Sequence, residues 1–222
     1  MKIFIDSADI DEIKKANELG IIDGVTTNPS LIAKEIEKDK EKTFEKIILE
    51  IVDEINVPIN VEVMSTETEE MIKEAIKLSE LSKNIVIKIP TIPSGLKAVR
   101  MLKKKNPEIK TNMTLIFGVC QSLLVARVGA TYASIFVGRL DDIGYDGMEI
   151  VRDSVKIFDL YNIDTEIITA SVRHPIHVIE AAKARSHIAT IPFNVLEKMI
   201  SHILTDKGIE KFMQDYEKFK LI

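Results

Sequence analysis

The chain has 222 residues, of which 45% are hydrophobic and 29% charged, as in ordinary globular proteins and unlike disordered or fibrous ones. Its formal net charge of −5 disfavours nucleic acid or an acidic membrane surface as the main partner, because both require clustered positive charge. No apolar run approaches the roughly 18 residues of a membrane span, and the N-terminal residues lack the pattern of a secretory signal. Together with the single cysteine, Cys120, these features predict a cytoplasmic protein without an internal disulfide.

Short β-rich runs alternate with amphipathic helical patterns along the whole chain. The predicted strands are Lys2–Asp6, Gly24–Thr27, Ile59–Met64, Asn84–Ile89, Lys110–Ile116, Thr131–Val137, Asp164–Ala170 and His187–Ile191. Eight strands, each followed by a helix, predict the α/β class and one single-domain (β/α)8 TIM barrel over residues 1–222. A further amphipathic stretch, about Asp206 to Phe219, predicts an extra C-terminal helix that either closes the barrel floor or packs on a neighbouring subunit.

Local signals predict where some helices begin and end. Asp9 and Glu12 have the spacing of a capping box, and Gly20 is a stop signal after the following helix. Thr66 and Glu69 have the spacing of a second capping box. The apolar neighbours of Cys120 predict that its thiol packs in the core and is not a nucleophile.

Several polar residues lie on strand faces that are expected to be apolar. Residues i and i+2 of a strand share a face, so Lys88 opposes Ile87 and Ile89. By the same reasoning five polar side chains point into the barrel, most of them late in their strands, where barrels build active sites: Asp6, Glu62, Lys88, Asn112 and Thr114. A structural lysine–carboxylate cluster is the alternative, but five such residues with one parity favour a functional site.

The apolar neighbours of Lys88 favour its neutral amine, because poor hydration disfavours the ammonium form. A neutral amine can attack a carbonyl and form an imine, which then acts as an electron sink for cleavage of a carbon–carbon bond. Asp6 and Glu62 are candidates for moving protons in such a cycle, and Thr114 for holding a water between Glu62 and the amine.

Two arginines follow neighbouring strands near the position where barrels often bind phosphate. Arg139 follows the sixth strand, and Ser171 and Arg173 follow the seventh. Arginine forks match phosphate oxygens, so the pair indicates an anion site, although Arg139 alone could equally pair with Asp141 or Asp142.

Six ordered motifs, spread over nearly the whole chain, resemble those of the transaldolase family, in particular its small prokaryotic branch. They are Phe4–Asp6, Asp23–Leu31, Val86–Pro90, Thr111–Phe117, Phe136–Asp142 and Ala170–Arg173. The resemblance implies a class I Schiff-base enzyme on a (β/α)8 barrel, with no metal and no organic cofactor. It also implies a place in the pentose phosphate pathway and a homo-oligomer, either a pentamer or a decamer.

The resemblance further implies a role for each site residue. Lys88 would attack the carbonyl of sedoheptulose 7-phosphate or fructose 6-phosphate, and Asp6 would take the hydroxyl proton that starts the retro-aldol cleavage. The dihydroxyacetone unit would then pass to glyceraldehyde 3-phosphate or erythrose 4-phosphate. Glu62 and Thr114 would hold water. Substrate hydroxyls would bind near Thr26, Asn28, Ser30, Asn112 and Ser134, and the phosphate at Arg139, Ser171 and Arg173. Phe136 would also line the substrate site.

A related branch, the fructose-6-phosphate aldolases, releases dihydroxyacetone and carries glutamine and tyrosine where this chain has Glu62 and Phe136. Both positions therefore favour transfer, with the aldolase and a non-catalytic phosphosugar-binding barrel as alternatives. Ile135 stands where the family usually has proline, and Ala184-Arg185-Ser186 where it usually has Gly-Ala-Asp. We expect the first departure to shift Phe136 and Arg139 slightly and the second to affect stability at most.

His174 and His177 have a spacing that can bind metal on a helix. No third ligand is evident from the sequence, and Pro175 suits a first helical turn, so ordinary helix residues are the favoured interpretation. Neither a phosphate-binding P-loop nor a dinucleotide-binding glycine motif is present, which disfavours a nucleotide cofactor.

Overall fold

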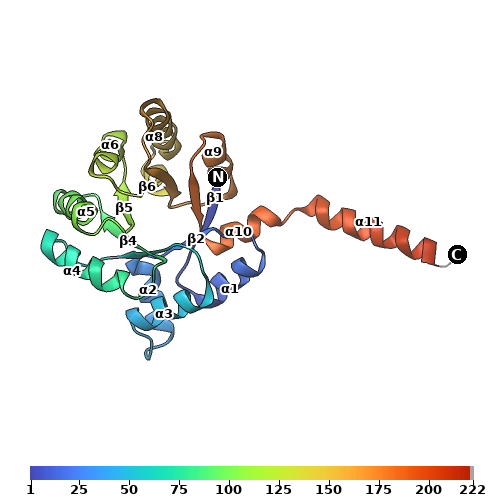
Figure 1. The fold of residues 1–222 in the computed structure, drawn as a ribbon. Helices are drawn as coiled ribbons and strands as arrows, with labels where there is room; N and C mark the ends of the chain where they lie inside the picture. Colours follow the sequence, from blue (N-terminus) through green and yellow to red (C-terminus); the bar gives the residue numbers. More distant parts are fainter. Residues whose placement is uncertain (221–222) are drawn as a thin grey trace.

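A computed structural model describes residues 1–220 and contains eight parallel strands that close into a barrel in chain order (Figure 1). All eight predicted strands are confirmed, although the second, third and sixth end earlier than predicted, at Thr26, Glu62 and Phe136. The strands are β1 Lys2–Asp6, β2 Gly24–Thr26, β3 Ile59–Glu62, β4 Ile85–Pro90, β5 Thr111–Ile116, β6 Tyr132–Phe136, β7 Glu166–Ala170 and β8 Ile188–Ile191.

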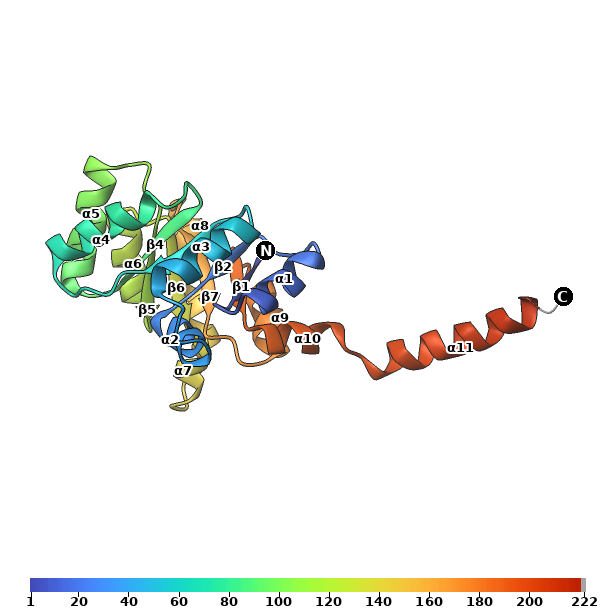
Figure 2. The same ribbon diagram turned by 90° about the horizontal axis from the view of Figure 1, so that it is seen from below.

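Helices surround the barrel, so the α/β TIM-barrel prediction is confirmed (Figures 1 and 2). Within residues 1–220, none of the helices is both long and apolar enough to cross a membrane. The helices are α1 Ile10–Glu18, α2 Pro29–Lys38, α3 Phe44–Glu54, α4 Thr68–Ser79, α5 Pro93–Lys105, α6 Val119–Val128, α7 Val137–Asp141, α8 Gly147–Tyr161, α9 Pro175–Lys183, α10 Phe193–Ile200 and α11 Ile203–Lys220.

The core has two layers, one between strands and helices and one inside the barrel. Ile87 and Ile89 of β4 belong to the outer layer, whereas Val86 belongs to the inner one, which consists of strand residues alone. Phe4 and Tyr132 meet edge to face in the inner layer, with ring centroids 6.2 Å apart. This alternation confirms the predicted parity of β4, and it places Lys88 on the inner face.

The helix starts differ in detail from the predicted capping boxes. Asp9 caps α1 by accepting the backbone N–H groups of Asp11 and Glu12, but the Glu12 carboxylate pairs with the Ser7 hydroxyl and not with Asp9. The predicted box at Thr66 is wrong, because α4 begins after Glu67 and has no side-chain cap. Instead, the Glu74 carboxylate accepts hydrogen bonds from the backbone N–H groups of Met64 and Ser65 in the loop after β3. A side chain from within α4 thus provides partners for the backbone donors of that loop.

Two further predictions about burial are corrected. Cys120 is exposed near the start of α6 and does not pack in the core, because the apolar pattern around it belongs to β5 and the helix turns it outward. The C-terminal helix exists as α11, slightly longer than predicted, but it extends away from the barrel and has no buried residue (Figures 1 and 2). It therefore does not close the barrel floor.

Candidate active site

A pocket opens at the carboxyl ends of the barrel strands, where parallel barrels place their active sites. Ten of the thirteen predicted site residues line it: Asp6, Thr26, Asn28, Ser30, Lys88, Ser134, Phe136, Arg139, Ser171 and Arg173. The other three, Glu62, Asn112 and Thr114, do not line the pocket and lie on the strands on either side of Lys88. Thr190 also lines the pocket and was not predicted.

Lys88 is only 4% exposed near the end of β4. Its Nζ lies 2.9 Å from the backbone oxygen of Thr27 and 3.2 Å from Oε2 of Glu62. The strand register sets Glu62 and Asn112 directly beside Lys88, one on each neighbouring strand. The amine is therefore held in a fixed position, shielded from bulk water, with a carboxylate able to exchange a proton with it.

Asp6 ends β1, and its Oδ1 accepts a hydrogen bond from the Thr26 hydroxyl at 2.7 Å. The Thr26 and Thr190 hydroxyl oxygens are 2.6 Å apart. Since the Thr26 proton is donated to Asp6, Thr190 is the donor in the second bond. Burial raises the pKa of Asp6 above its usual range, although the Lys88 charge and the Thr26 hydrogen bond act in the opposite direction. A carboxylate with a raised pKa is better matched to accepting a proton near neutral pH.

Asn112 is fully buried and belongs to a chain of amide hydrogen bonds. Its Nδ2 donates to Oδ1 of Asn60 at 2.9 Å, and its Oδ1 accepts from the Ser134 hydroxyl at 2.8 Å. Asn60 in turn donates to the backbone oxygen of Val25 at 2.9 Å, which sets the orientation of both amides. Asn60 was not predicted as a site residue, although it shares a strand face with Glu62 and that parity could have identified it.

Thr114 lies where β5 departs from regular geometry. The pairing of β5 with β6 shifts register between Met113 and Ile116, and Leu115 has a positive φ of 60°. The Thr114 hydroxyl is buried and has no hydrogen-bond partner among the described residues. Because a buried unpaired hydroxyl typically costs about 1–3 kcal/mol, this oxygen is suited to a partner that arrives with the substrate or solvent.

The far side of the pocket carries the two predicted anion-binding arginines, both exposed. The guanidinium carbon of Arg139 lies 5.2 Å from the centroid of the Phe136 ring, within the range of a cation–π contact. Arg173 forms an ion pair with Asp142 at 2.8 Å. Within residues 1–220 Arg139 forms no ion pair with Asp141 or Asp142, so that alternative is not realised and its donors stay available for an anion.

The loop after β2 contributes Asn28 and Ser30 at the start of α2. Asn28 is the N-cap, and its Oδ1 accepts the backbone N–H of Leu31 at 3.0 Å. This bond leaves the amide nitrogen as a donor on the pocket side of the cap.

Ile135 lies in β6, which pairs with β7 without a break from Tyr132 to Phe136, whereas its pairing with β5 shifts register just before Ile135.

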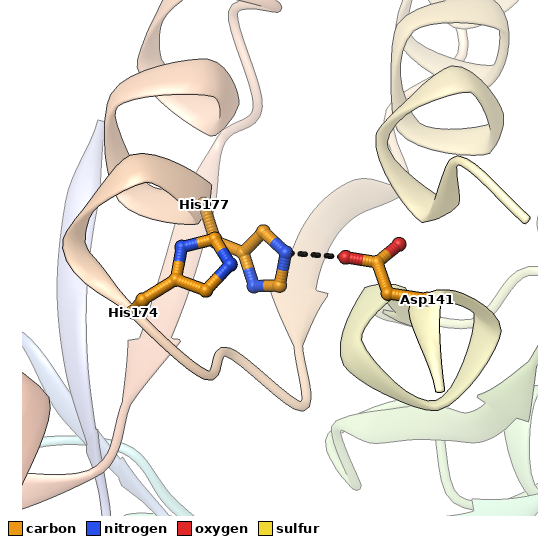
Figure 3. Close-up of side chains that lie close together, drawn as sticks. All are labelled: Asp141, His174 and His177. Carbon is orange, nitrogen blue, oxygen red and sulfur yellow. Dashed lines mark hydrogen bonds and ion pairs between the residues drawn. The ribbon is translucent and has the colours of Figure 1, made fainter. Parts of the chain in front are cut away.

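Asp141, His174 and His177 form a cluster whose potential ligand atoms lie within 4.8 Å of one another (Figure 3). Asp141 is thus the third group that the sequence did not reveal. However, Nδ1 of His177 accepts the backbone N–H of Arg173 at 3.2 Å, so the proton of the neutral ring lies on Nε2, which faces Asp141 at 2.6 Å. Histidines that bind metal usually donate a proton from the second ring nitrogen. This geometry favours a hydrogen bond to Asp141 over a metal ligand.

Comparison with known proteins agrees with this site. The family described as Transaldolase/Fructose-6-phosphate aldolase matches residues 3–221. A protein named "Probable transaldolase" from Thermoanaerobacter sp. (strain X514) is 57% identical over 218 residues, covering 98% of each chain. Another of that name, from Thermodesulfovibrio yellowstonii, is 54% identical over 220 residues, covering 99% of this chain and 100% of the relative.

A solved structure, the thiamine phosphate pyrophosphorylase from Pyrococcus furiosus, superposes with a TM-score of 0.57 at 12% identity. It covers 86% of this chain and 85% of its own, and it shows a shared fold alone. The family match spans nearly the whole chain. The chain belongs to the transaldolase/fructose-6-phosphate aldolase family.

Proposed function

We propose that the protein is a transaldolase that carries a dihydroxyacetone unit on Lys88. The donor is a ketose phosphate, sedoheptulose 7-phosphate or fructose 6-phosphate, and the acceptor is glyceraldehyde 3-phosphate or erythrose 4-phosphate. The observation that carries the proposal is the buried Lys88 amine, held between Thr27 and Glu62 at a pocket lined by polar side chains. The names of the curated relatives support the same activity.

The first half-reaction needs one nucleophile and one base. The neutral Lys88 amine adds to the ketose carbonyl, and loss of water leaves a protonated imine. Asp6 takes the proton of the hydroxyl on the carbon β to the imine carbon. The bond between the α and β carbons breaks, its electron pair moves to the imine nitrogen, and an aldose phosphate leaves. The three-carbon enamine stays on Lys88, and Asp6 holds the proton.

The second half-reaction reverses these steps on the acceptor. The enamine carbon bonds to the acceptor aldehyde, the new alkoxide takes the proton from Asp6, and water hydrolyses the imine to release the longer ketose. Glu62 lies 3.2 Å from Nζ, which suits it to moving protons to and from the water that is lost and regained. The unpaired buried hydroxyl of Thr114 supports its role in holding that water.

Binding groups surround the reacting carbons. We assign Arg139, Ser171 and Arg173 to the phosphate, aided by the free backbone N–H groups at the start of α9. We assign the hydroxyls of the sugar to the polar lining, namely Thr26, Asn28, Ser30 and Ser134, with Asn112 acting from behind the lining through its hydrogen bond with Ser134. Phe136 supplies an apolar wall that packs edge to face on Phe117. Neither a metal nor an organic cofactor is needed for this chemistry.

Transfer is favoured over release by Glu62 and Phe136. A tyrosine at the position of Phe136 would bring an additional proton donor to the pocket and so help to release the three-carbon fragment. Phe136 carries no such group, so the enamine persists until an acceptor aldehyde arrives. The place of the reaction in the pentose phosphate pathway and in the cytoplasm follows from this choice of substrates.

We further propose that the barrel and α11 form one domain that assembles into a pentamer or a decamer. α11 is outside the barrel and exposes large apolar side chains, which favours burial against another copy of the chain (Figure 2). Its apolar residues are Ile203, Leu204, Ile209, Phe212, Met213, Tyr216 and Phe219. Sedimentation of the wild type and of Phe212→Asp tests this, and the variant is expected to form smaller assemblies.

The activity is tested by measuring glyceraldehyde 3-phosphate release from fructose 6-phosphate with and without erythrose 4-phosphate. Release that depends on the acceptor is expected. Equal release without the acceptor, accompanied by free dihydroxyacetone, would make the protein an aldolase. No turnover and no imine trapped by borohydride would leave a phosphosugar-binding barrel.

A further inference from the structure

We propose that His177 is a positioning residue for the phosphate subsite, through its hydrogen bond to Asp141. The bond ties α7, which carries Arg139, to the start of α9, which directly follows Arg173 (Figure 3). The inference rests on the proposed phosphate-binding role of the two arginines. It gives a role to the histidine pair that the sequence analysis singled out and that the reaction does not use.

His177 is buried, with 4% of its surface exposed, and both of its ring nitrogens are engaged. Nδ1 accepts the backbone N–H of Arg173 at 3.2 Å, and Nε2 donates to Oδ2 of Asp141 at 2.6 Å. The other carboxylate oxygen of Asp141 accepts the backbone N–H of Gly147 at 2.9 Å, which orients the carboxylate toward the histidine. One imidazole therefore connects the backbone at Arg173 with the end of α7.

The beginning of α7 contacts the same loop directly. The backbone N–H of Gly138 donates to the Ser171 oxygen at 3.1 Å. A Cβ at position 138 would lie 2.1 Å from that oxygen, so only glycine allows the approach. Ser171 itself has a positive φ of 59°, an unfavourable conformation for a non-glycine residue that its surroundings must maintain. The loop after β7 thus contacts the beginning of α7, the first turn of α9 contacts its end, and Arg139 lies between the two contacts.

This arrangement matters because both arginines are long, exposed side chains, Arg139 on the short helix α7 and Arg173 on the loop after β7. Exposed arginines lose conformational freedom when they bind an anion, and a scaffold that sets their spacing in advance lowers that loss. The ion pair of Arg173 with Asp142 also joins the loop to the end of α7, but both of its side chains are exposed, and such pairs contribute little. The Gly138 contact and the His177–Asp141 bond are the better shielded links between the two segments.

Three substitutions separate the functions of the two ring nitrogens. His177→Asn keeps an acceptor near the Nδ1 position for the Arg173 N–H but loses the donor to Asp141. His177→Gln keeps a donor near the Nε2 position and loses the other contact. His174→Ala is the control for the ring contact alone: His174 is exposed and contributes no side-chain cap, and its removal takes away the contact with the His177 ring, 3.9 Å between centroids, but neither hydrogen bond of His177.

The primary measurement is the affinity of each full-length protein for inorganic phosphate, by calorimetry. We expect the Kd to rise by up to about tenfold in His177→Asn, because binding must then also order α7 against the loop, and the energy of the lost hydrogen bond sets the upper limit of that cost. It should rise less than about threefold in His177→Gln and stay unchanged in His174→Ala. Borohydride trapping of the imine that Lys88 forms with unphosphorylated dihydroxyacetone should match the wild type in all three.

Equal phosphate affinity in His177→Asn and the wild type would overturn the proposal, as would equal losses in the Asn and Gln variants. If the wild type binds no phosphate, the result contradicts both the proposed phosphate subsite and the role of His177. Imine trapping still tests the role of Lys88 separately. Should His177→Asn fail to fold, Asp141→Ala breaks the same bond from its exposed side. That variant must then show the rise in Kd, and an unchanged Kd contradicts the proposal.

Discussion

The two ends of the pocket are built differently. At the imine end, Lys88, Glu62 and Asn112 lie side by side on three neighbouring strands, and their positions follow from the strand register. At the phosphate end, Arg139 and Arg173 are exposed and follow the ends of their strands. The comparison shows that the residues around the imine are positioned by strand pairing, whereas the phosphate-binding arginines are positioned by individual side-chain contacts.

The difference has a physical purpose. A nucleophile must meet the substrate carbonyl in one fixed position, which pairing with the neighbouring strands provides. A phosphate-binding group benefits from staying charged and accessible, since two different sugar phosphates must enter and leave during one cycle. Substitutions at the imine end should therefore lower kcat, and those at the phosphate end should raise KM.

Replacing the nucleophile gives the largest expected effect. Lys88→Ala should reduce turnover on the order of 10⁴-fold or more, because no other amine can form the imine. Circular dichroism should show a folded barrel, since the other strand and core residues are unchanged. A variant that retained wild-type turnover would contradict the Schiff-base mechanism. It would also contradict the view that one end of the pocket forms the imine and the other binds the phosphate.

Asp6→Asn should lower kcat by about 10²–10⁴-fold, the usual contribution of a positioned general base. Asp6 acts as a base only when ionised, and burial raises its pKa. Wild-type kcat should therefore fall, as pH decreases, at a higher pH than the value of about 3.9 for an exposed aspartate. A pH profile of the residual activity of the variant should lack this fall. If kcat of the wild type and of the variant fell over the same pH range, the fall would belong to a group other than Asp6.

The raised pKa of Asp6 also has a consequence for stability. The folded state binds the Asp6 proton more tightly than the unfolded state, so this group contributes stability at low pH that is lost as pH rises through the raised pKa. Asp6→Asn should then gain unfolding free energy relative to the wild type as pH increases from about 4 to 8. Urea unfolding at several pH values measures the difference, and a difference that shrinks with pH would contradict the sign.

Arg139→Ala should raise KM for fructose 6-phosphate about 10–100-fold, as expected for loss of charge-assisted hydrogen bonds. Borohydride trapping of the Lys88 imine with unphosphorylated dihydroxyacetone should change little, because Lys88 and Asp6 are untouched. Steady-state kinetics with fructose 6-phosphate and trapping with dihydroxyacetone provide the test. A fall in kcat together with a loss of trapping would mean that the two ends of the pocket are not separable in this way.

The smallest effect is expected at the opposite end of the barrel. Arg185 follows the end of α9 with a positive φ of 59°, a conformation that glycine adopts without penalty. Arg185→Gly should stabilise the fold by about 1 kcal/mol, because the exposed ion pair with Asp159 contributes little. Chemical denaturation measures the gain, and kcat and KM should both match the wild type.

The alternation of residues along the strands made most of the barrel and the imine end predictable. Lys88, Asp6 and Glu62 stood out because a charge on an inward strand face is unusual. Asn60 and Thr190 lie on inward faces by the same rule and could have been found, although an uncharged side chain is a weaker signal.

Other features depended on tertiary contacts that no short pattern encodes. The clustering of Asp141 with His177 joins residues 36 positions apart, across two helices. Cys120 lies in an apolar stretch, and only the direction of α6 decides that its side chain is exposed. The direction of α11 likewise follows from the loop that precedes it, since its own amphipathic pattern fits either a barrel or another subunit.

The most direct test of the central claim is to incubate the protein with fructose 6-phosphate, reduce it with borohydride, and locate the modified residue by peptide mass spectrometry. We predict one reduced three-carbon unit per chain, attached to Lys88, and none in Lys88→Ala. Attachment to another lysine, or no covalent adduct in a protein that still turns over substrate, would contradict the assignment of Lys88 as the nucleophile.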